Sequence, residues 1–295
     1  MQPLVSVIMS TYNREDLVKE AVFSVLNQSF ENFEFIVIDD NSTDNTIEIL
    51  KNFKDKRLKV FKNRTNCGCT FNYHNAQNLA NGEYIAHIDD DDIWLKDKLE
   101  KQVAFIEENS EIVLLGSFIE TFGENARPSW VFDTNSDKLA FLMNFYNPIC
   151  HSAIIYRKNF MLKNGINYDI WKKCSQDYDF YRQILEANGK LSNLPEILVR
   201  YRMHKKRITD IKETQNIQIY NAENTKKALL SKFLNDEEII EITELMHGFP
   251  FNEYNIPNIL TAIEKAFVKY GKKYGIDERI LEEVKNDIIK GLYRF

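Results

Sequence analysis

The sequence predicts an α/β fold in which a mostly parallel central sheet is flanked by helices and followed by a C-terminal helical extension. Over the first hundred residues, short apolar runs alternate with segments whose apolar residues recur at helical spacing. Such alternation is typical of parallel strands whose connecting helices cover both faces of a sheet. From about residue 205 onward, strand patterns stop and helical periodicity dominates. We therefore expect a first domain over residues 1–204 and a helical region over residues 205–295.

Four short apolar runs predict the first strands, and a helical pattern follows each of them. The runs are Leu4–Met9, Phe35–Ile38, Leu58–Phe61 and Tyr84–Ile88, and the helical patterns span residues 17–25, 44–50, 70–80 and 96–109. Asn13 is expected to cap the first helix, because asparagine is favoured at that position. Beyond residue 110, we expect strands at 112–122, 152–156 and 197–201, and helices within 132–146 and at 177–187.

Charge and cysteine content exclude several classes of protein. With 38 Lys and Arg against 44 Asp and Glu, the net charge is −6, and the pI near 5.6 argues against a nucleic-acid partner. Four scattered cysteines are too few for a disulfide scaffold and favour a reducing, intracellular setting. No run approaches the roughly 20 apolar residues that span a bilayer. We therefore expect a cytoplasmic protein that at most lies on the inner face of the cytoplasmic membrane.

Polar side chains follow three of the predicted strands at the point where each strand ends. The segments are Ser10–Asn13, Asp39-Asp40 and Asp89–Asp92. In open α/β sheets, ligands bind outside the carboxyl ends of the strands, so three segments distant in sequence are expected to converge on one site.

The acidic segments each admit a functional and a structural interpretation. The four adjacent carboxylates of Asp89–Asp92 repel one another and raise each other's pKa, and a bound Mg²⁺ or Mn²⁺ would relieve this repulsion. The alternative is a solvated acidic turn that caps the next helix. Asp39-Asp40 is suited to hydrogen bonding a nucleotide base or ribose, or to capping the turn before Ser42.

The stretches VSVIMSTYNRE, FIVIDDNSTDNT and NGEYIAHIDDDDIW together resemble the family 2 glycosyltransferases. The resemblance runs from about Leu4 to His204 and keeps the order and spacing of the family's motifs. It implies the GT-A fold, which is Rossmann-like, and an inverting enzyme that uses a nucleotide sugar. No counterpart of the Gln-x-x-Arg-Trp signature of processive synthases is present, so single-sugar addition is expected.

The resemblance implies roles for the first two strand ends. Ser10, Thr11 and Tyr12 lie where the family holds the nucleoside, with Tyr12 available to stack on the base. Asp40 matches the position that contacts uracil in enzymes that use UDP-sugars.

The third strand end matches the DXD region of the family. Asp91 would be the direct metal ligand, and Asp89 and Asp90 would contact the ribose, metal-bound waters or the sugar. Near residue 200, Arg202 and His204 match a signature near the diphosphate. His204 would ligate the metal or bond a phosphate, and Arg202 would neutralise charge; the alternative is a strand end entering the basic loop Lys205–Arg207.

Asp177 falls where the family carries its general base, the carboxylate that takes the proton from the attacking hydroxyl. The preceding Gln176 replaces the usual Glu. The alternative for Asp177 is a simple helix cap. His151 and the aromatic side chains of Trp130 and Trp171 lie in segments that resemble the sugar and acceptor pocket, although internal packing is an equal or better explanation of such residues.

The resemblance thus implies the transfer of one hexose or N-acetylhexosamine from a UDP-sugar to a glycan or lipid-linked glycan, assisted by Mn²⁺ or Mg²⁺. Synthesis of bacterial cell-surface polysaccharide or lipooligosaccharide is the expected setting. Two alternatives are a sugar-phosphate nucleotidyltransferase, although no glycine-rich phosphate loop follows the first strand, and a non-catalytic module that binds sugar nucleotides. The region 205–295 is expected to serve packing, formation of a homo-oligomer, or membrane-surface contact through the amphipathic helix near 259–273.

Overall fold

The structure is a computed structural model, and it describes residues 2–124, 126, 129, 133–204, 212–245, 256–280, 282–284 and 286. Its strands are β1 (Val5–Thr11), β2 (Phe33–Asp39), β3 (Leu58–Lys62), β4 (Tyr84–His87), β5 (Ile93–Trp94), β6 (Ile112–Gly123), β7 (Ile155–Arg157) and β8 (Lys190–Met203). Its α-helices are α1 (Val18–Leu26), α2 (Thr46–Asn52), α3 (Cys69–Leu79), α4 (Lys98–Glu108), α5 (Ser136–Leu142), α6 (Lys158–Asn164), α7 (Gln176–Glu186), α8 (Lys212–Leu230), α9 (Asp236–Leu245) and α10 (Ile256–Tyr274).

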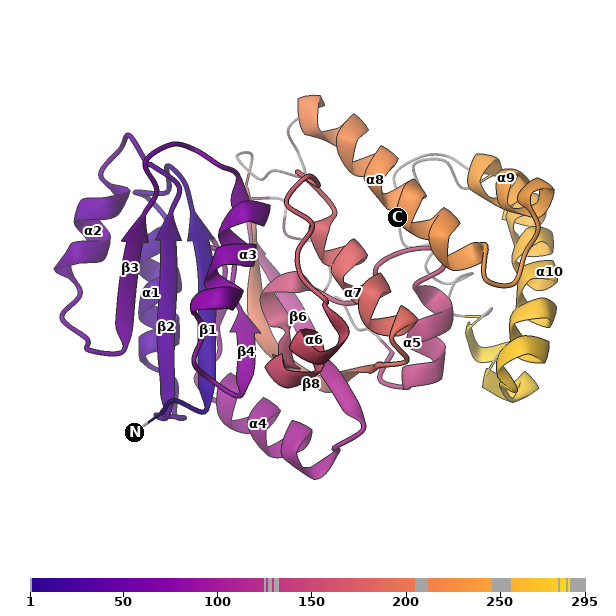
Figure 1. Cartoon of the computed structure of the whole chain (residues 1–295), viewed down its shortest axis with the longest axis horizontal. Coiled ribbons are helices and arrows are strands. Elements are labelled where there is room, and N and C mark those ends of the chain that lie inside the picture. The colour runs from indigo at the N-terminus through magenta and orange to yellow at the C-terminus, as the bar shows by residue number, and fades with distance from the viewer. Residues whose placement is uncertain are drawn as a thin grey trace.

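The first four strands form the parallel half of the sheet. Their order is β3-β2-β1-β4, and the register of β1 against β2 runs from Val5 opposite Phe33 to Thr11 opposite Asp39. The strands therefore end level with one another, and the arrowheads of β1, β2 and β3 point to the same upper edge in Figure 1. This shared edge brings together the polar segments that follow the strands.

The second half of the sheet is mixed. β7 pairs antiparallel with β4 and β6, β8 runs parallel to β6, and the two-residue β5 closes the sheet against β8. The expected strand at 152–156 is wrong in its first part, because a 3₁₀ turn, η1, occupies His151–Ala153. The strand expected at 197–201 is only the end of the longer β8.

Apolar side chains fill the space on both sides of the sheet. One cluster joins Val7 and Met9 of β1 to Val22 of α1 and Leu99 of α4. The other joins Ile8, which points the opposite way from β1, to helices on the other face, including α3 and α7. This alternation of buried side chains confirms the expected sheet covered by helices on both faces.

The C-terminal helices share a third cluster with α5. Ile263, Ala266 and Tyr270 of α10 lie in one core with Phe141 and Phe145. The apolar face of α10 is thus covered by the rest of the chain, which is the packing alternative for this helix. The division at residue 204 stays a prediction. Among the described residues, none of the helices has both the length and the apolarity that crossing a bilayer requires.

Candidate active site

The segments after β1 and β2 meet through sharp backbone turns. Asn13 and Asn41 adopt left-handed conformations with φ of 52° and 64°. The sequence predicts that Asn13 caps α1, and this prediction is wrong. Instead its Oδ1 accepts a hydrogen bond from the backbone N–H of Thr43 at 2.9 Å, which ties the two strand ends together. The N-cap position of α1 belongs to Leu17.

The predicted nucleoside residues lie at this joint. Ser10 and Thr11 are buried, and the hydroxyl of Ser10 accepts a hydrogen bond from the Asn72 amide at 2.9 Å. Tyr12 is 42% exposed, so the face of its ring is accessible to a planar base. The buried hydroxyl groups of Ser10 and Thr11 thus lie next to the partly exposed aromatic side chain of Tyr12.

Asp40 holds the loop between β3 and α3. Its buried carboxylate accepts hydrogen bonds from the side chain of Asn63 at 2.8 Å and from the backbone N–H groups of Cys67 at 2.9 Å and Gly68 at 2.8 Å. Gly68 has a φ of 87°, a conformation that favours glycine. Asp40 therefore shapes the wall of the site, and its contact with uracil stays a prediction.

Each carboxylate of Asp89–Asp92 has a separate partner. Asp90 pairs with Arg14 at 3.2 Å, and Asp92 accepts a hydrogen bond from the backbone N–H of Arg202 at 2.8 Å. The Nε2 atom of His87 lies 3.0 Å from Asp89. The positive charge of Arg14 comes from the segment after β1, 76 positions from Asp90 in the chain, so no local sequence pattern links the two residues.

Three carboxyls of this cluster, those of Asp89, Asp90 and Asp92, have raised pKa values, as the run of adjacent carboxylates predicts. Burial raises the pKa of Asp90 to about 7 and that of Asp89 to about 6, and the neighbouring charge of Asp91 adds to both effects. Burial also raises the pKa of Asp92 well above its ordinary value, and one of its oxygens, Oδ2, is buried without a hydrogen-bond partner. Four adjacent carboxylates, of which only Asp90 is paired with an arginine side chain among the described residues, suit a divalent cation.

Asp91 and His204 place two potential metal-ligand atoms side by side. Their Oδ2 and Nε2 atoms lie 2.9 Å apart, so both donor atoms face the same point. Carboxylate oxygen suits Mg²⁺ and Mn²⁺, and imidazole extends the choice toward transition metals. A second group of potential ligand atoms, from His87, Asp89 and His151, lies within 4.8 Å of one another. The residues present therefore fit a metal ion, whose identity they do not determine.

Arg202 bonds the backbone of the acidic turn. Its Nε donates to the backbone oxygen of Asp91 at 2.8 Å, its Nη2 donates to Glu20 at 2.5 Å, and its guanidinium lies 4.4 Å from the centre of the Phe122 ring. The side chain is thus engaged by protein groups. Its contact with a diphosphate stays a prediction, and the loop Lys205–Arg207 lies outside the described residues.

Asp177 is the second residue of α7, and Gln176 is the first. Both are partly exposed, and Ser175 before them has a left-handed φ of 54°. The Nδ2 group of Asn147 donates to Oδ2 of Asp177 at 2.8 Å. Burial raises the pKa of Asp177 to about 6, against the lowering effect of the Tyr178 N–H, and the charge of Asp89 raises it further. Asp177 therefore lies within electrostatic reach of the acidic turn.

Of the other residues predicted for the sugar and acceptor pocket, His151 is buried and Trp171 is exposed. His151 is stacked on His87 with ring centroids 3.6 Å apart, and its Nε2 lies 2.8 Å from the hydroxyl of Tyr168. This is the internally bonded alternative for His151. Trp171 is 87% exposed on the loop that leads to α7. Trp130 lies outside the described residues.

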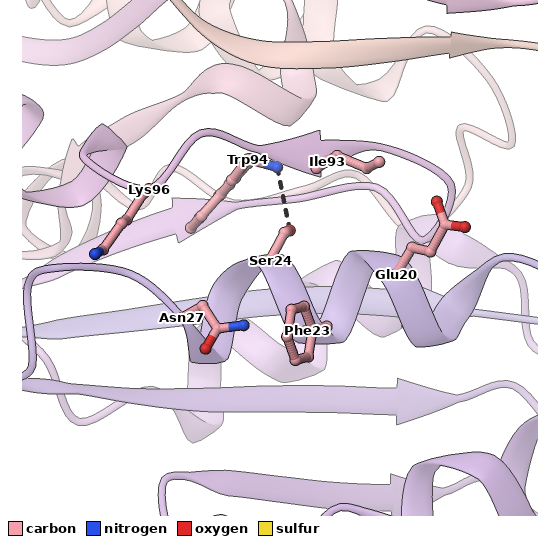
Figure 2. A pocket seen from close by; sticks show the side chains of 7 residues that line it. All are labelled: Glu20, Phe23, Ser24, Asn27, Ile93, Trp94 and Lys96. Atoms are coloured by element: carbon pink, nitrogen blue, oxygen red, sulfur yellow. Dashed lines mark hydrogen bonds between the residues drawn. The ribbon is translucent and has the colours of Figure 1, made fainter.

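A hollow of about 470 Å³ lies between α1 and β5, away from the residues predicted for the site. Figure 2 shows its lining side chains, including Phe23 beside the hydrogen bond from the backbone N–H of Trp94 to Ser24. Glu20 borders it and also binds Arg202, which donates to the backbone oxygen of Asp91 in the acidic turn.

A Rossmann-like sheet whose parallel strands deliver carboxylates to one edge, together with a carboxylate in the first turn of α7, is the arrangement of a nucleotide-sugar-dependent glycosyltransferase with the GT-A fold. Residues 6–171, over half of the chain, match the family described as Glycosyl transferase family 2. The chain belongs to this family. The fold and family expected from the sequence are confirmed, and the nucleotidyltransferase and non-catalytic alternatives gain no support.

Three of the proteins that this chain resembles come from bacteria. An uncharacterized glycosyltransferase of Haemophilus influenzae is 30% identical over 286 residues, which cover 91% of this chain and 88% of that protein. The Escherichia coli protein WfaP, named as a UDP-Glc:alpha-D-GlcNAc-diphosphoundecaprenol beta-1,3-glucosyltransferase, is 31% identical over 68% of this chain and 78% of its own. The solved structure of Staphylococcus aureus TarS 1–349 in complex with UDP-GlcNAc shares the fold, with a TM-score of 0.67, 20% identity, and coverage of 99% and 89%.

Proposed function

We propose that this protein transfers a single hexose or N-acetylhexosamine from a UDP-sugar to a hydroxyl group of a glycan or lipid-linked glycan, with inversion at the anomeric carbon. The observation that carries the proposal is the convergence of separate segments on the acidic turn, where Asp90 pairs with Arg14 at 3.2 Å and Asp91 lies 2.9 Å from His204. Asp177, whose pKa burial raises to about 6, is the carboxylate that we assign to the acceptor hydroxyl. Inverting transfer needs one carboxylate on the side opposite the leaving group.

The proposed reaction assigns a separate task to each part of the site. Ser10, Thr11 and Tyr12 hold the nucleoside, and Asp40 sets the wall against which the base lies. The Asp177 carboxylate takes the proton from the acceptor hydroxyl as its oxygen bonds to the anomeric carbon. The bond from that carbon to the diphosphate breaks at the same time, and its electron pair leaves with UDP.

The departing diphosphate requires positive charge. Asp91 and His204 would hold a divalent cation, with Asp89 and Asp90 beside it, and the cation would act as a Lewis acid toward the diphosphate. The imidazole of His204 favours Mn²⁺ over Mg²⁺. Arg14 and Arg202 balance the carboxylates that surround this position.

The names of two similar proteins support the choice of substrates. WfaP is named for a UDP-glucose donor and a diphosphoundecaprenol-linked acceptor, and TarS was solved with UDP-GlcNAc. A lipid-linked acceptor would bring this protein to the cytoplasmic face of a membrane, where cell-surface polysaccharide is assembled. We include that location in the proposal.

A donor screen tests the proposal. UDP-glucose, UDP-GlcNAc, UDP-galactose, GDP-mannose and dTDP-glucose are offered with a GlcNAc-diphospholipid acceptor, in Mn²⁺, in Mg²⁺ and in EDTA. Nucleotide release and the anomeric configuration of the product by NMR are the measurements. We expect a UDP-sugar to be used in Mn²⁺ and to give a β-linkage from an α-donor. Release of GDP or dTDP alone, full activity in EDTA, or a retained anomeric configuration would contradict the donor, the metal or the stereochemistry, respectively.

A further inference from the structure

We propose that Asn147 is a positioning residue that fixes the carboxylate of Asp177 for proton removal. The inference rests on the proposed function, because it assigns a partner to the proposed base. Asn147 lies in the segment between α5 and η1, 30 positions from Asp177 in the chain. Its amide reaches one carboxylate oxygen, Oδ2, at 2.8 Å.

The orientation of the Asn147 amide follows from its second contact. Its Oδ1 accepts a hydrogen bond from the backbone N–H of Ile149 at 3.1 Å. An N–H group can only donate, so the oxygen of the amide must face Ile149 and the NH₂ group must face Asp177. Asn147 therefore always presents a donor to the carboxylate, which favours the ionised form that accepts a proton.

The backbone around Asn147 is anchored, so the donor is held in place. Ile149 is buried in the core cluster beneath α7, and the backbone oxygen of Pro148 accepts a hydrogen bond from Asn193 of β8 at 3.4 Å. Asp177 is held from its own side by the start of α7, where the Tyr178 N–H also bonds its carboxylate. Two separately anchored segments thus meet at this hydrogen bond.

The other titratable groups that influence Asp177 do not replace this donor. They are Asp89 at the end of β4, Cys150 before η1, Tyr168 and Cys174 on the loop before α7, and Tyr178 and Tyr181 on α7. Burial raises the pKa values of these cysteines and tyrosines, so all of them are neutral near pH 7. The charge of Asp89 opposes ionisation of Asp177, and the Asn147 amide offsets part of that effect.

Two substitutions and a matched control test the role. Asn147→Ala removes the donor, and Asn147→Asp keeps the shape while placing a second carboxylate beside Asp177. Asn144→Ala is the control, because the Asn144 amide is buried nearby in the chain and donates to the backbone oxygens of Ala140 and Phe141 instead of to a carboxylate. The measurement is the pH profile of kcat for UDP release from the donor used by the wild type, with its acceptor and with water in its place.

For Asn147→Ala we expect a roughly threefold lower kcat at pH 6.5, an unchanged KM for the donor, and an acidic limb moved upward by about one pH unit. For Asn147→Asp the limb should move further, because two adjacent carboxylates compete for one proton. Activity should return in both variants at higher pH. Asn144→Ala should lower the melting temperature without moving the limb.

An acidic limb that stays in place in both Asn147 variants would overturn the inference, as would a loss of kcat matched by an equal rise in donor KM. The base itself is tested separately with Asp177→Asn. If that variant turns over normally, the proposed function has failed at its base. If it is inactive while Asn147→Ala keeps the wild-type profile, only the role of Asn147 has failed. A double-mutant cycle of the two substitutions in urea unfolding reports their coupling without any assay of activity.

Discussion

The Oδ2 atom of Asp91 lies 2.9 Å from Nε2 of His204, although 113 positions separate the two residues in the chain. β8 runs beside β5 and β6 and ends beside the turn after β4, which brings the histidine to the carboxylate. The contact therefore depends on the pairing of β8 within the sheet. It places an imidazole nitrogen beside the carboxylates of the acidic turn.

Removal of the Asp91 carboxylate should abolish metal-dependent nucleotide binding. We expect Asp91→Ala to lose the heat of UDP binding in Mn²⁺, measured by isothermal titration calorimetry, and to lower transfer by at least about 10²-fold. His204→Ala should have a smaller effect and raise the Mn²⁺ concentration needed for half-maximal activity by about tenfold, because one ligand of several is removed. Glu48→Gln, on the exposed face of α2, is the control. Unchanged Mn²⁺ dependence in both site variants would place the metal elsewhere.

Asp177→Asn should separate catalysis from binding. The amide cannot accept the proton, so we expect transfer to fall by about 10²–10⁴-fold while UDP binding in Mn²⁺ stays at the wild-type level. The same variant should unfold at a higher temperature at pH 8. A carboxyl whose pKa is raised on folding loses stability as pH rises through its folded value, and an amide does not. Near-normal turnover would remove Asp177 from the role of base.

The pH dependence of transfer should follow the ionisation of Asp177. Its pKa of about 6 means that the reactive, ionised form is lost as pH falls below 6 and is complete above about 7. We expect kcat at saturating donor and Mn²⁺ to rise tenfold per pH unit below 6 and to reach a plateau above 7. A profile that is flat from pH 5 to 8 would contradict this assignment.

Glu34 should stabilise the parallel half of the sheet in a pH-dependent way. Its buried carboxylate accepts hydrogen bonds from Lys59 at 2.6 Å, Ser6 at 2.7 Å and the backbone N–H of Asn81 at 2.7 Å. Although burial acts to raise the pKa of Glu34, these bonds lower it below 4.5. Its contribution is therefore complete above pH 4.5 and is lost as pH falls through the lower folded value.

We expect Glu34→Gln to lower the free energy of unfolding by about 1–3 kcal/mol at pH 7 and by less at pH 4, measured by urea denaturation. Glu48→Gln, whose side chain is exposed, should change it by less than about 0.5 kcal/mol. An equal loss at both pH values would show that packing, and not the charge of Glu34, accounts for the effect.

Asn221 links the C-terminal helices to the loop before Asp177. Its amide donates to the backbone oxygen of Cys174 at 2.9 Å, and the Ser175 hydroxyl donates to the backbone of Gln218 at 3.2 Å. Asn221→Ala leaves the Cys174 oxygen without this donor, which should cost about 1–3 kcal/mol and lower kcat several-fold. Asn216→Ala, exposed on the same helix, is the matched control. Wild-type kcat in a less stable Asn221→Ala variant would confine α8 to a structural role.

The sequence predicts those strands and helices whose apolar and polar residues follow a regular pattern. The end of a buried strand is visible as a change from apolar to polar residues, which is how the segments containing Asp40 and Asp91 were found. β5 was missed because two residues carry no periodicity. α6 was missed because its seven residues bury only Met161 and therefore show no apolar stripe.

Contacts between distant side chains leave no such pattern. Arg14 balances Asp90 across 76 positions, and Asn147 reaches Asp177 across 30, yet neither residue stands in a recognisable motif with its partner. His151 illustrates the same limit, since only the structure shows that its ring stacks on His87 and bonds Tyr168. The motifs therefore predict where the site lies, whereas the partners of its carboxylates and imidazoles are visible only in the three-dimensional structure.

Three non-glycine residues, Asn13, Asn41 and Ser175, hold left-handed backbone conformations next to the strand ends and the start of α7. Such a conformation costs an L-residue roughly 1–2 kcal/mol. Exchange for glycine would relieve that strain but would also remove the side-chain bonds by which Asn13 and Ser175 hold their neighbours. Substitutions intended to raise the thermal stability of this enzyme should therefore spare these three residues. Stability gained there would be accompanied by weaker positioning of the segments that form the site.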